Sequence, residues 1–191
     1  MVERGVLVDH ATLHRWAIQI LPALAVVFRS RKRLVGTGWR MDETCIKVAG
    51  QRKYRYRAVD RDCDTIDFLL CDKRDCAAAR CSLEGAIDLL GVPEKITIDK
   101  SDANTAAIQS VLADSGADIQ MRQNNYLNNM VEQDHRAIKL IVRPILGSKS
   151  FACARVLIAG VETMHTIRKG QCDRPEGKAS SAANQFYSLA S

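Results

Sequence analysis

The sequence lacks any uninterrupted apolar run of the roughly 18 residues that a membrane-spanning helix requires. The longest candidate, residues 18–28, contains Pro22 and is followed by four basic residues within five positions. The start of the chain is charged, and no small-residue cleavage site follows a clean apolar stretch, so we expect no signal peptide. These absences predict a cytoplasmic protein that makes no contact with a membrane.

The seven cysteines form no CxxC pair, and the four histidines do not lie at zinc-ligand spacing from them. An odd number of cysteines in a chain of 191 residues also argues against a disulfide framework. We therefore expect reduced and mostly buried thiols. Hydrophobic residues make up 47% of the chain and charged residues 26%, which is typical of a globular protein with a sizeable core.

Positive charge is concentrated near the start of the chain. Most of the formal net charge of +6 comes from the first 40 residues, where seven Lys and Arg residues face only Glu3 and Asp9. A second basic cluster, residues 52–57, alternates with two tyrosines, so a strand would place its basic side chains on one face. Such clusters suit a polyanion such as DNA, although a solvated strand face remains the alternative.

The pattern of apolar residues and turn signals predicts an α/β fold. Three strands in succession, separated by turns at Gly50 and at the 60–64 cluster, indicate an antiparallel meander. Alternating helices and strands follow, which favours a mixed sheet flanked by helices. The expected helices are 9–21, 75–90, 102–115, 128–143 and 151–168, and the expected strands are 39–48, 54–59, 65–70, 95–99 and 118–122, with a polar tail from residue 170.

Three acidic residues stand out by their positions in this pattern. Asp42 lies inside the first strand of the meander, Asp99 ends the strand at 95–99, and Glu132 lies near the start of a late helix. Acids at strand ends and helix starts are often solvated or capping groups, but an acid inside a strand resists burial unless it is paired or metal-bound. Because the first and fourth strands of such a sheet can be neighbours, these carboxylates can meet, and their oxygens suit Mg²⁺ or Mn²⁺.

Several separate motifs follow one another along the chain: WRMDET, YRAVDRD with TIDFLL and KRD, ITIDK, YLNN with EQDH, RPILGSKSF and AGVETMHTIRKGQ. In this order they resemble the bacterial transposases of the insertion-sequence-six family. The resemblance runs from about Arg4 to Gln171 and includes a start that is similar to the end of that family's helix-turn-helix.

The resemblance implies an RNase H-like core of the DDE recombinases and integrase catalytic cores. It implies that Asp42, Asp99 and Glu132 are the catalytic acids and hold two Mg²⁺ or Mn²⁺ ions. The implied activity is DNA transposition of a mobile element: water cleaves the transposon end, and the freed 3′-hydroxyl attacks target DNA. The implied partners are transposon ends, target DNA and further copies of the chain, and the implied place is the bacterial nucleoid.

Basic residues near two of these motifs are candidates for DNA contact. On a helix, Arg136, Lys139 and Arg143 fall close to the face that carries Glu132, where phosphates must lie. In the predicted first helix, Thr12, His14 and Arg15 are the early positions that a recognition helix presents to the groove. We expect Trp16 to pack inside the small N-terminal segment.

The domain division that follows has three parts: a partial helix-turn-helix and linker at 1–35, an RNase H-like catalytic domain at 36–170, and a polar tail at 171–191. The resemblance starts inside the family's helix-turn-helix, so we expect a copy truncated at its N-terminus. The segment of 32 residues between Asp99 and Glu132 is also slightly shorter than usual in the family. A catalytically inactive DNA-binding remnant of such a transposase is therefore the alternative function.

Overall fold

The computed structural model describes residues 2–3, 6–124, 150–172 and 181–189. The helix expected at 128–143 lies outside these residues. The elements are β1 (Val2–Glu3), β2 (Val6–Leu7), α1 (His10–Ser30), β3 (Gly38–Val48), β4 (Gln51–Val59), β5 (Thr65–Cys71), α2 (Cys76–Leu90), β6 (Lys95–Ile98), α3 (Asp102–Ser115), β7 (Gln120–Gln123), α5 (Phe151–Arg168) and α6 (Ala182–Ser188).

A five-stranded mixed sheet in the order β5-β4-β3-β6-β7 forms the centre of the molecule. β5, β4 and β3 are antiparallel neighbours, whereas β6 and β7 run parallel to β3 and to each other. The hairpin between β3 and β4 turns at Ala49 and Gly50, which both have positive φ angles, as a tight two-residue hairpin loop requires. The predicted meander and the predicted pairing of its first strand with the fourth are confirmed.

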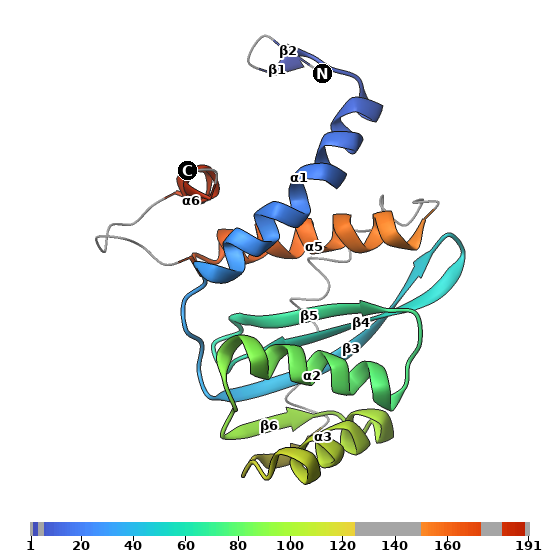
Figure 1. Cartoon of the computed structure of the whole chain (residues 1–191), viewed down its shortest axis with the longest axis vertical. Coiled ribbons are helices and arrows are strands. Elements are labelled where there is room, and N and C mark those ends of the chain that lie inside the picture. The colour runs from blue at the N-terminus through green and yellow to red at the C-terminus, as the bar shows by residue number, and fades with distance from the viewer. Residues whose placement is uncertain (1, 4–5, 125–149, 173–180, 190–191) are drawn as a thin grey trace.

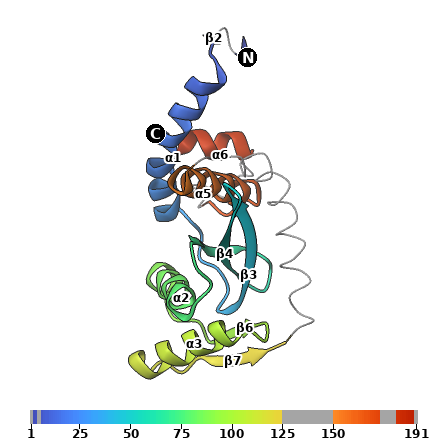
Figure 2. The ribbon, with the colours of Figure 1, turned by 90° about the vertical axis from the view of Figure 1, so that its right-hand side faces the viewer.

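Helices cover both faces of this sheet (Figures 1 and 2). On one face, Trp39 and Met41 of β3 and Ile96 of β6 pack against Leu83 of α2 and Ile108 of α3. On the other face, a second cluster of Ile46, Val48 and Leu70 packs against Ala154 and Ile158 of α5. Because side chains alternate along a strand, even-numbered residues of β3 face the α5 side and odd-numbered residues up to Glu43 face the α2 and α3 side.

Helix α1 is longer than the sequence pattern predicts, because it continues through Pro22 to Ser30 instead of ending at residue 21. Proline removes a helical N–H and crowds the preceding turn, which is the reason for expecting a break there. In the structure, Leu24, Val27 and Phe28 pack with Ile167 of α5, so tertiary contacts stabilise the helix beyond the proline. The first half of α1 extends away from the sheet (Figure 1).

By length and composition alone, α1 is long and apolar enough to cross a membrane, although polar residues and Pro22 interrupt its apolar residues. Core helices and signal sequences meet the same criterion, and Phe28 is its one fully buried residue. Contacts with α5 and α6 give partners to Leu24, Val27 and Phe28 in its second half, whereas Trp16, Ile20 and Val26 are exposed.

Two smaller expectations differ from the structure. All seven cysteines are free, as expected, but Cys172 alone is fully buried, and three of the others are exposed. The segment expected to be loop-like near the C-terminus contains helix α6, whose Phe186 and the following Leu189 pack near Phe28. This contact links the C-terminal helix to the end of α1.

Candidate active site

The sheet brings two of the three predicted catalytic acids together. β3 and β6 pair in parallel with Gly38 opposite Lys95 and Arg40 opposite Thr97. Two residues further along the same register, Asp42 of β3 and Asp99, which follows β6 directly, come to the same level on adjacent strands. Since paired residues of parallel strands project on the same side of a sheet, Asp42 projects to the α5 side with Arg40 and Thr97, and Asp99 directly follows the last residue of β6.

Asp42 is 9% exposed, so its carboxylate lies almost entirely inside the protein. Its Oδ1 accepts a hydrogen bond of 2.8 Å from the backbone N–H of Glu43. An ionised carboxylate at this depth needs compensating partners, and a cation between two such groups is one way to supply them. The burial of Asp42 thus agrees with the reasoning that singled it out from the sequence.

The neighbouring acid, Glu43, points to the opposite face and has a different partner. It forms an ion pair with Arg74, and its position opposite Tyr56 places it on the α2 side. Burial raises the pKa of Glu43, the Arg74 guanidinium opposes this shift, and the charge of Asp99 raises the pKa further.

Asp99 has a partner in the first turn of α3. The side-chain amide of Asn104 donates a hydrogen bond to Asp99 Oδ1 over 3.5 Å, and Asn104 is 2% exposed. Among the described residues, Asn104 Oδ1 is a buried oxygen atom without a hydrogen-bond partner. Amide and carboxylate oxygens are hard donors of the kind that Mg²⁺ and Mn²⁺ prefer, so the residues present fit a divalent cation.

A buried ion-pair cluster lies on the same side of the sheet as Asp42. Glu162 of α5 accepts a hydrogen bond of 2.8 Å from Arg55 Nη1 and lies 3.5 Å from Arg57 Nε. Arg57 is directly opposite Asp42 in the β3–β4 register and also donates to Thr65 Oγ1. All three charged side chains of the cluster are at most 2% exposed.

This cluster corrects the expectation that the basic residues of β4 form a solvated face or a DNA-contacting one. Arg55 and Arg57 are buried because α5 brings a carboxylate to them. Lys53 is also buried and pairs with Asp72, while its ammonium group lies 5.2 Å from the Phe151 ring centroid. Sequence reasoning missed Glu162, although it is the single acidic residue of α5 and was a usable signal.

The predicted DNA-contacting residues are only partly within the described chain. Thr12, His14 and Arg15 lie in the first half of α1, where His14 and Arg15 are exposed and Arg15 donates a hydrogen bond of 3.1 Å to Thr12 Oγ1. Trp16 is 45% exposed, so within the described residues it is not the packed core residue that we expected. The remaining predicted residues lie outside the described ranges: Glu132, Arg136, Lys139 and Arg143.

Because Glu132 is outside those ranges, the described residues hold two of the three predicted acids and no group of three possible metal ligands. The structure therefore places Asp42 and Asp99 together and leaves the third position untested.

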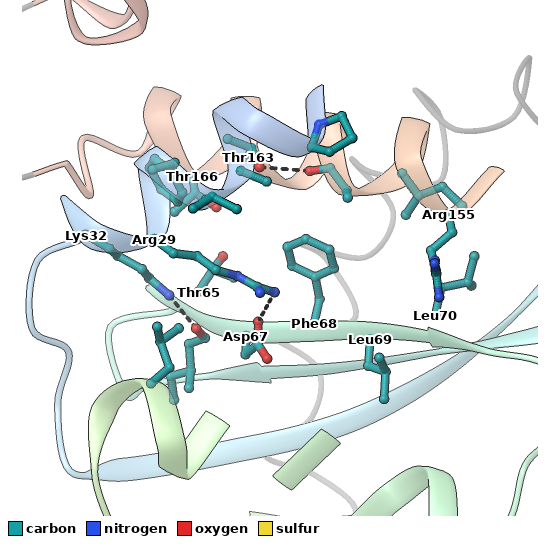
Figure 3. Close-up of a pocket in the computed structure, with 18 residues that line it drawn as sticks. Arg29, Lys32, Thr65, Asp67, Phe68, Leu69, Leu70, Arg155, Thr163 and Thr166 are labelled. Atoms are coloured by element: carbon teal, nitrogen blue, oxygen red, sulfur yellow. Dashed lines mark hydrogen bonds and ion pairs between the residues drawn. The ribbon is translucent and has the colours of Figure 1, made fainter. Parts of the chain in front are cut away.

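A cavity of about 370 Å³ separates α1 from β5 and α5, and no predicted site residue lines it (Figure 3). Across it, Arg29 of α1 pairs with Asp67 of β5 at 3.4 Å, and Lys32 donates a hydrogen bond to the carbonyl of Ile66. Burial raises the pKa of Asp67, against the effect of Arg29, and burial lowers the pKa of Lys32 to about 8. These contacts fasten α1 to the edge of the sheet.

The chain is similar to known transposases over most of its length. A family described as a DDE domain matches residues 36–171. The transposase for insertion sequence-like element IS431mec of Staphylococcus aureus is 32% identical over 168 residues, which cover 87% of this chain and 74% of the relative. The transposase for insertion sequence element IS257 in transposon Tn4003, also from Staphylococcus aureus, is 31% identical over 167 residues, which cover 87% and 73%.

Solved structures with the same fold are retroviral integrase catalytic cores. The core domain of HTLV-2 integrase in complex with magnesium has a TM-score of 0.55 at 19% identity, with 83% of this chain and 99% of that chain covered. The core domain of BIV integrase has a TM-score of 0.53 at 16% identity, with 81% and 96% covered. These likenesses confirm the expected RNase H-like α/β fold, and the sequence matches define the family: this chain belongs to the DDE transposases of the insertion-sequence-six family.

Proposed function

We propose that Asp42, Asp99 and Glu132 are the catalytic acids with which this transposase cleaves a phosphodiester and transfers the DNA strand. The observation that supports the proposal is the parallel register of β3 and β6, which pairs Arg40 with Thr97 two residues before Asp42 and Asp99. Membership of the DDE transposases implies the use of a divalent metal ion. The choice of Mg²⁺ or Mn²⁺, and a complement of two ions, belong to the proposal.

The residues around the two acids have definable tasks. Asp42 is oriented by the N–H of Glu43, and Asp99 by the amide of Asn104, so each carboxylate keeps one oxygen in a fixed direction. Asp42, Asp99 and Glu132 would hold the two cations, which would supply positive charge to the attacking and the leaving oxygen of a phosphodiester displacement. The acids would fix the position of the cations and not contact the scissile phosphate themselves, because like charges repel, and Asp42 is largely shielded from bulk water.

DNA recognition is proposed to use two separate regions. Thr12, His14 and Arg15 on the projecting half of α1 would contact the transposon end, while Arg136, Lys139 and Arg143 would contact phosphates beside Glu132. The division into segments 1–35, 36–170 and 171–191 is part of this proposal. So are assembly of several copies on DNA and association with the nucleoid in the bacterial cytoplasm.

A strand-transfer assay tests the proposal. The protein is mixed with a pre-cleaved transposon-end duplex and a supercoiled target, in Mg²⁺, Mn²⁺ or EDTA, beside Asp42→Asn and Asp99→Asn. Joined product should need metal, and each variant should lose on the order of 10³-fold in rate or more. Asp88→Asn, which changes an exposed acid of α2, is the matched control and should retain the full rate.

The outcomes separate the possible functions. Strand transfer at the wild-type rate by Asp42→Asn or Asp99→Asn would refute the assignment of the acids. DNA binding without any metal-dependent product would identify the chain as a catalytically inactive remnant. Nicked DNA without joined ends would indicate a nuclease that has lost strand transfer.

A further inference from the structure

A basic groove of about 590 Å³ lies at the beginning of β3 and β6, apart from the cavity of Figure 3. Four cationic side chains line it, from β3, the β4–β5 turn, β6 and β7. They are Arg40, Arg61, Lys95 and Arg122. Two exposed carboxylates, those of Asp62 and Glu94, line it as well, so the cations outnumber the anions by two.

The strand register connects this groove to the catalytic acids. Arg40 is opposite Thr97, and Thr97 is opposite Arg122, so these three residues form one row across β3, β6 and β7. Asp42 follows Arg40 by two residues on β3 and therefore on the same side, and Asp99 follows Thr97 by two residues, directly after the end of β6. Two residues of a strand span about 6.6 Å, which places the basic row next to the acidic one.

Backbone hydrogen bonds hold the strands that line the groove in place, and its charged side chains are accessible to solvent. The carbonyl of Thr37 accepts hydrogen bonds from the N–H groups of Glu94 and Lys95, and Gln120 N–H donates to the carbonyl of Glu94. Arg61 and Arg122 are exposed and Lys95 is half-buried, whereas Thr97 forms a buried floor at 6% exposure. A concave surface with excess positive charge concentrates anions, and guanidinium groups match the geometry of phosphate oxygens.

We propose that this groove binds the sugar-phosphate backbone of the DNA strand whose reacting phosphate lies at Asp42 and Asp99. The inference rests on the proposed function, which supplies the position of that phosphate. Arg122 and Lys95 hold neighbouring phosphates on the side of the groove, and the contacts are independent of base sequence. The groove thereby sets the line along which the strand enters the active site.

Binding measurements on the full chain test this inference. The affinity for a pre-cleaved transposon-end duplex and for an unrelated duplex is measured in EDTA between 50 and 300 mM salt, for wild type and for Lys95→Gln with Arg122→Gln. Each lost phosphate contact lowers the slope of log affinity against log salt by about 0.7 to 0.9. The double variant should lose about 1.4 to 1.8 in slope and about tenfold or more in affinity at low salt, equally for both duplexes.

Control variants identify the origin of any loss. Arg52→Gln changes an exposed arginine of β4 at the opposite end of the sheet and should keep the wild-type slope. Arg122→Lys keeps the charge and should recover most of the slope that Arg122→Gln loses. The circular dichroism spectrum and the thermal midpoint of each variant confirm that it is folded.

Strand transfer by the wild type, measured alongside, separates this inference from the proposed function. If the wild type joins strands and the double variant keeps the wild-type salt slope and affinity, DNA binding by the groove is refuted and the proposed function stands. If the wild type joins no strands but the salt slope of the double variant is reduced with both duplexes, DNA binding by the groove is supported and the proposed function fails. A loss confined to the transposon-end duplex would refute backbone binding.

Discussion

Replacing Glu162 with glutamine removes a buried carboxylate that two buried guanidinium groups face. Glu162 is 0% exposed, lies 2.8 Å from Arg55 Nη1 and 3.5 Å from Arg57 Nε, and connects α5 to β4. Taking one partner out of a buried ion pair costs about 3–5 kcal/mol, because the remaining charge stays in a low-dielectric interior. Since domains of this kind are stable by about 5–15 kcal/mol, the expected loss is a large part of the total.

Urea unfolding followed by circular dichroism measures this loss. With a slope of about 2 kcal/mol per molar urea, the midpoint of Glu162→Gln should fall by about 1.5–2.5 M. Glu84→Gln is the matched control, because Glu84 is 45% exposed and pairs on the surface with Arg80, so its loss should stay below about 1 kcal/mol. Equal midpoints for the two variants would show that the buried carboxylate does not stabilise the contact between α5 and the sheet.

Two further variants test how α1 is held. A methyl group at Gly160 would come within 2.5 Å of Leu21 Cδ1, so Gly160→Ala should lower the free energy of unfolding by about 1 kcal/mol. In the Leu21→Ala background the added methyl group should have no such cost. A double-mutant cycle followed by thermal unfolding measures this, and additive losses of the two variants would contradict it. Burial lowers the pKa of Lys32 to about 8, so between pH 8 and 10.5 the unfolded chain binds more protons than the native one and stability should rise with pH. Urea unfolding at pH 7.5 and 10 should show a smaller increase in stability with pH for Lys32→Met than for the wild type. An equal increase in both proteins would show that it does not come from Lys32.

The elements with a strong local sequence pattern were predicted with correct or nearly correct bounds. Helices 102–115 and 151–168 have the predicted bounds, and the strand at 39–48 begins one residue earlier than expected. Apolar periodicity and turn residues determine these elements locally. The bounds of α1 were wrong because contacts with α5 and α6 stabilise the helix beyond Pro22, and those partners lie more than 100 residues away in sequence.

The candidate site was predictable in a similar way. An acid inside a strand and an acid at the end of another marked Asp42 and Asp99, and the parallel pairing of β3 with β6 brings them to one level. The environment of Arg55 and Arg57 was not predictable from β4 alone, since alternation gives the face of a side chain and not what covers it. Only the packing of α5 shows that these arginines face Glu162.

The alternation of β3 also separates two adjacent acids, of which we propose only Asp42 as a metal ligand. Asp42 and Glu43 are both shielded from solvent, but they project to opposite sides of the sheet. Glu43 meets Arg74 on the α2 side, which neutralises it within the protein. Asp42 shares its side with the row of Arg40, Thr97 and Arg122, and Asp99 directly follows the end of β6. In the function that we propose, basic groups for phosphates precede acids for cations by two residues along β3 and β6, which suits a polyanionic strand that crosses a metal site.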